Sequence, residues 1–182
     1  KPVENELNIA NNIATATIEV LEQQIKTLVV YTEPHPDIHA IMRTLGSNQK
    51  FEVSAQSFDE NIDFNSYDLI VAHQVKAAFL PKEKAKWIIG NEEKAYVQSA
   101  ESPTFNDNHP LQAILSQGIA AIEQWPPLQL GAKSQIGNPI IMQQDQPIWY
   151  IQESDQQLIT NGVGLWKWRM HNFKVWQNFD AF

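Results

Sequence analysis

Cysteine is absent from all 182 residues of the chain. Its absence excludes disulfide bonds, thiolate metal sites and thiol nucleophiles together. It identifies no compartment, because chains without thiols occur in both reducing and oxidising surroundings. Long apolar runs are missing as well, since stretches such as 69–72 and 87–90 fall far below the roughly 20 residues of a membrane span. We therefore expect no membrane insertion by this segment.

Basic clusters are missing too. The chain has 13 Lys and Arg residues against 21 Asp and Glu residues, which gives a net charge of −8. A phosphate backbone would be repelled by most of such a surface, so we do not expect nucleic acid as a partner. The hydrophobic share of 43% is enough for one core, and the length suits one domain.

Sequence motifs for phosphate, metal and hydrolytic sites are also absent. The segment 131–138 lacks the Walker spacing, and neither GxGxxG nor a GxSxG elbow occurs. His35 and His39 have the spacing of one helix face, with Asp37 between them, but HExxH is not present. Pro36 also places His35 at the helix entrance with nonhelical geometry. We therefore expect no metal and no cofactor.

Apolar runs of the kind buried in a parallel sheet occur at 27–32, 67–75 and 87–90. A further strand is predicted at 51–58, where apolar and polar residues alternate. Apolar residues with helical spacing predict a helix that opens at Pro36 or Asp37 and stops at Gly46; they are Ile38, Ile41, Met42 and Leu45. The segment 79–86 is short for a crossover helix. Strands separated by helical or mixed connections predict an α/β sheet with right-handed crossovers.

The remaining segments give weaker signals. Residues 13–20 alternate as a half-exposed strand, and 91–110 is predicted to be a long polar loop over the carboxyl edge of the sheet. Residues 111–122 fit either an interrupted helix or two short strands, and periodicity leaves this open. Residues 139–161 predict a β meander, which would extend the parallel sheet with antiparallel strands.

Polar residues stand where the predicted strands end. His35 and Asp37 lie between a buried strand and a helix, His73 and Gln74 end the next apolar strand, and Asn91 follows the third. In α/β folds this edge of the sheet presents ligand groups, and the amides at a helix N-terminus favour an anion. His35, Pro36 and Asp37 would also form a normal helix cap and first turn, and this structural role is the interpretation we favour.

The stretch 161–173, NGVGLWKWRMHNF, combines two glycines with two tryptophans, an arginine and a histidine. A turn at GVG predicts a helix from about residue 165 to 177. Its apolar residues form two stripes, Trp166, Met170 and Phe173 on one and Trp168, Val175 and Phe179 on the other. We therefore expect a broadly buried helix, with a cost of about 3–5 kcal/mol for truncating Trp166. Packing does not explain Lys167 and Arg169.

The order of a buried strand, PHPDIHAIMRTL, YDLIVAHQV, WIIG and NGVGLWKWRMHNF resembles the class I glutamine amidotransferase-like domains. It is most similar to a degenerate version carried by bacterial membrane-anchored proteins of unassigned role. The likeness covers residues 26–182, and residues 1–25 look like the tail of a preceding β-rich module or an N-terminal strand. The resemblance implies a flavodoxin-like three-layer αβα fold, with a mainly parallel sheet and an antiparallel extension near residues 139–161.

The ends of the chain and the resemblance predict what kind of protein the chain belongs to and where it is located. The chain begins with Lys1 rather than Met and ends abruptly at Phe182, so we expect a piece of a longer protein. By resemblance this piece is a soluble domain of a membrane-anchored protein, with the periplasm as one candidate compartment.

The catalytic residues of the family do not carry over. Working amidotransferases use a cysteine on a GxCxG elbow and an HxE pair, and here no cysteine exists and no histidine is followed by Glu two residues later. The resemblance therefore implies a pseudoenzyme without catalytic residues.

Two functions stay open at this point. The first is a noncatalytic ligand-sensing or protein-interaction domain of an envelope protein, for an unknown small ligand or protein partner. Its pocket would be lined by six residues: His35, Asp37, His73, Gln74, Asn91 and Arg169. The second is an enzyme with hydrolase-type chemistry that uses Asp37 or His73 as acid or base.

Overall fold

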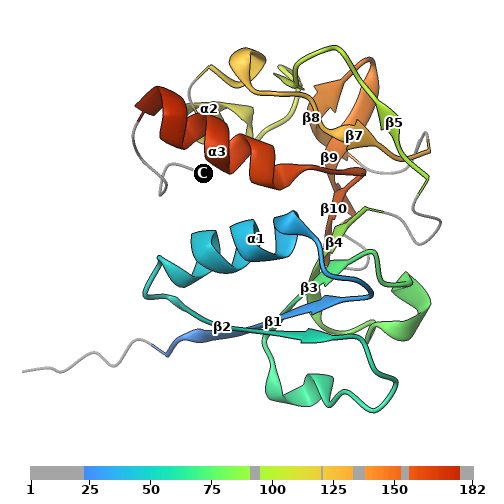
Figure 1. The fold of residues 1–182 in the computed structure, drawn as a ribbon. Coiled ribbons are helices and arrows are strands. Elements are labelled where there is room, and N and C mark those ends of the chain that lie inside the picture. The colour runs from blue at the N-terminus through green and yellow to red at the C-terminus, as the bar shows by residue number, and fades with distance from the viewer. Residues whose placement is uncertain (1–22, 91–94, 120, 133–137, 153–155, 177–182) are drawn as a thin grey trace, which may run out of the picture.

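The computed structural model describes residues 23–90, 95–119, 121–132, 138–152 and 156–176. It has a mixed α/β fold built on one large sheet (Figure 1). The eight strands of this sheet run in the order β2-β1-β3-β4-β10-β9-β8-β6, and a small sheet has the order β11-β7-β5. The predicted strand at 13–20 lies outside the described residues.

Five strands form the parallel part of the large sheet. They are β1 (Ile25–Tyr31), β2 (Phe51–Ser57), β3 (Leu69–His73), β4 (Ala85–Ile89) and β10 (Gln157–Thr160). Each neighbouring pair among them is parallel. The prediction of a parallel sheet from the apolar runs is therefore confirmed.

The antiparallel part continues from β10 through β9 (Gln146–Gln152) and β8 (Asn138–Gln143) to β6 (Thr104–Phe105). Gln144 and Asp145 join β8 to β9 and both have φ of 56°. Positive φ at two central residues is the geometry of a type I′ hairpin turn, which suits the twist of paired strands. The antiparallel extension near residues 139–161 is confirmed.

The three α-helices of the described residues contribute to one core cluster. α1 (Pro36–Gly46) supplies the buried Ile38 and Ile41, and α3 (Leu165–Trp176) supplies the buried Leu165 and Trp168. The partly buried Leu115 of α2 (Gln112–Gly118) packs against this cluster. α1 and α3 pack against each other (Figure 1). No described helix is long and apolar enough to cross a membrane.

A second core cluster contains the side chains that point the other way from the parallel strands, including Leu28, Val30 and Ile70. Side chains from loops and from the 3₁₀ turn η2 (Phe64–Ser66) pack against it, and a second 3₁₀ turn, η3 (Ala77–Phe79), lies between β3 and β4. None of the three α-helices contributes to this cluster. The described residues thus place their helical layer on one face of the sheet.

In the middle of the chain one prediction needs revision, and one open alternative is decided in favour of a helix. The segment 91–110, predicted as a loop, contains β6 and another short strand, β5 (Val97–Gln98). β5 pairs with β7 (Gln129–Leu130), which also pairs with β11 (Gly162–Val163). Strands of two residues are too short to leave a periodic pattern. The ambiguous segment 111–122 forms α2 and the start of a 3₁₀ turn, η4 (Ile122–Gln124).

The prediction of a broadly buried C-terminal helix is wrong. Trp166 has 37% of its surface exposed, and Met170 and Phe173 are also exposed. Leu165, Trp168 and Asn172 form the buried stripe instead. α3 packs on the core along one narrow face and leaves its other side to solvent, so two apolar stripes in the sequence do not mean two buried stripes. Phe179 lies outside the described residues.

Candidate functional site

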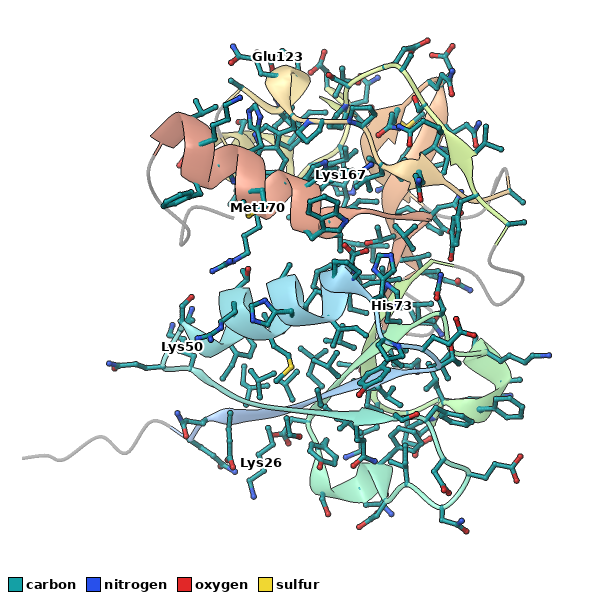
Figure 2. All side chains as sticks on the ribbon, in the orientation of Figure 1. Lys26, Lys50, His73, Glu123, Lys167 and Met170 are labelled. Atoms are coloured by element: carbon teal, nitrogen blue, oxygen red, sulfur yellow. The ribbon has the colours of Figure 1, made fainter. Side chains whose placement is uncertain are left out.

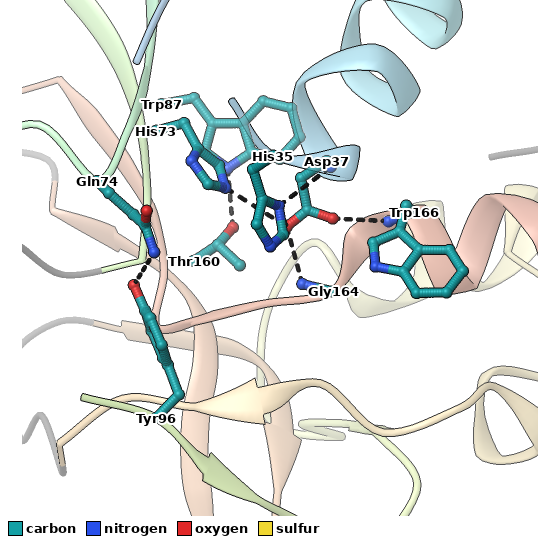
Figure 3. Close-up of polar contacts among 9 residues, drawn as sticks. All are labelled: His35, Asp37, His73, Gln74, Trp87, Tyr96, Thr160, Gly164 and Trp166. Carbon is teal, nitrogen blue, oxygen red and sulfur yellow. Dashed lines mark hydrogen bonds and ion pairs between the residues drawn. The ribbon is translucent and has the colours of Figure 1, made fainter. Parts of the chain in front are cut away.

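The parallel strands place His73 on the helical side of the sheet. Val71 belongs to the core cluster that the helices cover, and His73 is two residues further along β3 on the same face. β3 ends at His73, beside the loop that leads from β1 into α1. His35 is the N-cap of that helix and Asp37 lies in its first turn. These three side chains therefore meet at one point, which Figure 3 shows in close-up; Figure 2 shows the position of His73 in the molecule.

Asp37 links α1 to the beginning of α3. The Gly164 N–H donates to Oδ2 of Asp37 and the Trp166 N–H donates to Oδ1, each over 2.8 Å. The Asp37 side chain is fully buried. A carboxylate near free amides at a helix N-terminus is stabilised by hydrogen bonds and by the helix dipole. Asp37 thus caps a helix that follows it by more than 120 residues in sequence.

Two imidazole rings lie beside this carboxylate. His35 Nδ1 is 3.4 Å and His73 Nε2 is 3.5 Å from Oδ2 of Asp37. The two rings stack with centroids 4.7 Å apart and an angle of 27° between their planes. His35 Nδ1 also accepts the N–H of Asp37 over 3.2 Å, a long bond that caps α1.

His73 is the least satisfied of the three side chains. It is fully buried, and neither Nδ1 nor Nε2 makes a hydrogen bond within the described residues. Its approach to Asp37 is at the outer limit of hydrogen-bond length. A buried polar group without a partner costs about 1–3 kcal/mol, so native structures seldom leave one in place without a reason.

The environment keeps Asp37 ionised. Burial raises the pKa of this carboxyl, but the His35 and His73 side chains and the amides of Gly164 and Trp166 lower it by more. The net effect holds the pKa of Asp37 well below its usual value. Asp37 is therefore a negative charge at neutral pH and cannot serve there as a general acid.

Comparisons with known proteins give a fold but no family. No family model and no curated protein matches the chain. A cytoplasmic protein from Salmonella typhimurium has a similar solved structure, with a TM-score of 0.52 and 10% sequence identity. The match covers 86% of this chain and 95% of that one. At this identity the likeness concerns the fold alone.

Gln74 and Arg169, both predicted site residues, do not join the cluster. The Gln74 side chain points away from Asp37 (Figure 3), and its Nε2 donates to the Tyr96 hydroxyl over 2.9 Å. Arg169 lines a separate open hollow of about 200 Å³ between α1 and α3, where His39 also lies. Asn91 lies outside the described residues. The predicted site thus divides into a buried cluster and two side chains at its flanks.

Sequence reasoning placed His35, Asp37 and His73 together but missed two features of the site. The histidine pair that it weighed for a metal, and set aside, was His35 with His39; the fold brings His35 to His73 and leaves His39 exposed. It missed Tyr96, which stands in the polar segment after β4. It also missed that the amides of Gly164 and Trp166 point at Asp37, although the glycines of GVG did predict the turn before α3, in which Gly164 has φ of 113°.

The donor atoms of the cluster suit a bound cation better than acid catalysis. One nitrogen from each histidine and one oxygen of Asp37 all lie within 4.8 Å of one another. Two imidazoles and a carboxylate are a donor set that divalent transition metals use.

Proposed function

We propose that the chain is a noncatalytic domain of the class I glutamine amidotransferase-like type, with a variant of the flavodoxin-like fold in which the α-helices of the described residues cover one face of the sheet. In this proposal it is the ligand-sensing or protein-interaction part of a larger envelope protein. Its ligand site is the carboxyl edge of the parallel sheet, at His35, Asp37 and His73. The observation that carries the proposal is the fully buried His73, which makes no hydrogen bond among the described residues although its Nε2 lies 3.5 Å from the ionised carboxylate of Asp37.

The chemistry of the chain supports a noncatalytic role. The chain has no cysteine for attack on a glutamine amide. Asp37 is ionised, and each of its oxygens already accepts a backbone N–H. It therefore lacks the proton that an acid must donate.

A thermal-shift screen of small ligands tests the ligand site. We expect at least one compound class to raise the melting temperature of the wild type, and to raise that of His35→Ala much less. His171→Ala is the matched control, because His171 lies on α3 and is absent from the cluster. A screen without hits, or hits that His35→Ala leaves unchanged, would reject the site. Ammonia release from glutamine by the purified chain would reject the noncatalytic role.

A protein partner is supported by the exposed side of α3. Trp166, Met170 and Phe173 are exposed apolar side chains on one side of this helix. Large apolar side chains that gather on a surface often mark an interaction site. If they do so here, Met170→Ser should weaken capture of the partner by the intact protein without lowering the melting temperature. Capture that is unchanged in this variant would exclude α3 as the contact.

A hydrolase remains the second candidate, because His35 and His73 do point into a common cluster rather than to different faces. In that case His73 would act as a general base. Hydrolysis of activated esters that is lost in His73→Gln, and kept in His171→Gln, would favour it. The noncatalytic proposal expects no such turnover in any of these variants.

A further inference from the structure

We infer that the cluster is a binding site for a divalent transition-metal ion of the zinc type. The ligands are Nδ1 of His35, Oδ2 of Asp37 and Nε2 of His73. This inference rests on the proposed ligand site at the same edge of the sheet and names the class of its ligand.

The spacing of the donor atoms fits one metal ion. Zinc binds nitrogen and oxygen at about 2.0–2.1 Å in tetrahedral sites, so two of its ligands lie about 3.3–3.4 Å apart. The two measured separations from Asp37 Oδ2, to His35 Nδ1 and to His73 Nε2, are 3.4 Å and 3.5 Å. The third separation, between the two imidazole nitrogens, is at most 4.8 Å, and it is the side of the triangle that metal binding would adjust.

The unbonded nitrogens of His73 supply an independent argument. The ring is fully buried, and within the described part of the chain it makes no hydrogen bond. A metal ion would satisfy Nε2 and offset the cost of burying it.

Local charge decides which cations fit. The N-termini of α1 and α3 each act as roughly half a positive charge, and both lie at Asp37. Together they offset most of the carboxylate charge, so a hard cation that binds oxygen by charge gains little. Binding then depends on the two imidazoles, which suit zinc, copper and nickel rather than magnesium or calcium.

The surroundings also match those of a metal site with an open position. The amides of Gly164 and Trp166 fix the orientation of the Asp37 carboxylate, as outer-shell groups do around metal ligands. The His35 side chain is 27% exposed, so the cluster reaches solvent on that side. Metal binding at Nδ1 would replace the long 3.2 Å hydrogen bond from the Asp37 N–H.

Calorimetric titration of the untagged, chelator-stripped 182-residue chain with zinc at pH 7.5 tests the inference. We expect one zinc ion per chain, and at least a tenfold weaker affinity in His35→Gln and in His73→Gln. The matched controls are His39→Gln, which removes the histidine with helical spacing to His35, and His171→Gln, and both should bind as the wild type does. Magnesium and calcium should give no binding. Cobalt should give a visible absorption spectrum that His35→Gln abolishes.

The outcomes separate this inference from the proposed function. Absence of zinc binding, or binding that both His35→Gln and His73→Gln leave unchanged, overturns the metal site. Binding that His39→Gln abolishes overturns the ligand assignment. If circular dichroism shows that His73→Gln does not fold, the zinc titration of His35→Gln still tests the inference, because the His35 side chain is partly exposed. If the chain binds no zinc but small ligands still raise its melting temperature in a way that depends on His35, the proposed function stands without the metal site. If neither zinc nor any small ligand binds, the proposed function is rejected as well.

Discussion

At the scale of single residues, Asp37 takes part in the caps of two helices. Its own backbone N–H is bonded to His35 Nδ1 at the start of α1, and its carboxylate accepts two amides at the start of α3. The carboxylate is buried, so these hydrogen bonds are not exchanged for bonds to water. Substitution at this position therefore tests structure as well as function.

Asp37→Asn should lower the free energy of unfolding by about 1.5–3 kcal/mol, because the amide nitrogen of Asn cannot accept the N–H that a carboxylate oxygen accepts. Chemical denaturation at pH 7 with a chelator present measures this difference. A loss below about 0.5 kcal/mol would mean that the two amides are satisfied without Asp37.

The difference in free energy of unfolding between the wild type and Asp37→Asn depends on pH. The pKa of Asp37 is lowered in the folded chain, so the ionised carboxylate adds stability that is present above the unfolded value of about 3.9. This contribution is lost as pH falls below that value toward the folded pKa. Denaturation curves at pH 7, 4 and 3 should thus show a shrinking gap between wild type and Asp37→Asn. A gap that stays constant would contradict the lowered pKa.

Trp166 and Trp168 differ in burial although they are two residues apart. Trp168 is fully buried, its Nε1 donates to the Pro126 carbonyl over 2.7 Å, and its ring lies 5.0 Å from that of Trp125. Trp168→Ala should cost about 3–5 kcal/mol, and Trp166→Ala less than about 1.5 kcal/mol. Paired urea denaturation measures both. Equal losses would restore the broadly buried helix that the sequence predicts.

At the scale of elements, the turn between β10 and α3 carries the amide of Gly164 to Asp37. β11 lies in this turn and pairs with β7, so the small sheet fixes where α3 begins. Gly162 stands in β11 where a Cβ would lie 2.6 Å from the Gln129 carbonyl oxygen. The Cβ would meet backbone rather than a flexible side chain, so any larger residue at Gly162 must push β11 away from β7.

Gly162→Ala should therefore cost about 1–3 kcal/mol. Gly46→Ala is the matched control, because a Cβ at Gly46 has nothing within 4 Å and Ala favours the end of α1. The control should leave the melting temperature unchanged or raise it. If both variants melt alike, the tight approach of β11 to β7 does not exist in solution.

The elements differ in how well the sequence predicts them. Runs such as LVVY and LIVAH are buried in a parallel sheet and carry a signal of their own, and α1 has both a periodic face and a clear end. α3 is rich in apolar residues on two sides, and the sequence does not say which side meets the core. β5, β7 and β11 have two residues each, which is too few for any pattern.

At the scale of the whole molecule, the candidate site depends on contacts between distant segments. His35, Asp37 and His73 could be proposed together from sequence, because parallel strands end at one edge of the sheet. The backbone N–H donors of Gly164 and Trp166 could not be predicted, since every residue except proline carries such a group and the sequence does not single one out. The stacking of His35 on His73 also depends on how α1 leaves the sheet, which no local pattern records.

The central claim is that His35, Asp37 and His73 form one buried cluster. Long-range ¹H–¹⁵N spectra of the five imidazoles in wild type and Asp37→Asn, recorded with a chelator, test it most directly. We expect the ring nitrogen signals of His35 and His73 to shift in the variant, and those of His39, His109 and His171 to stay in place. A His73 signal that does not respond to Asp37→Asn would contradict the cluster and, with it, the ligand site.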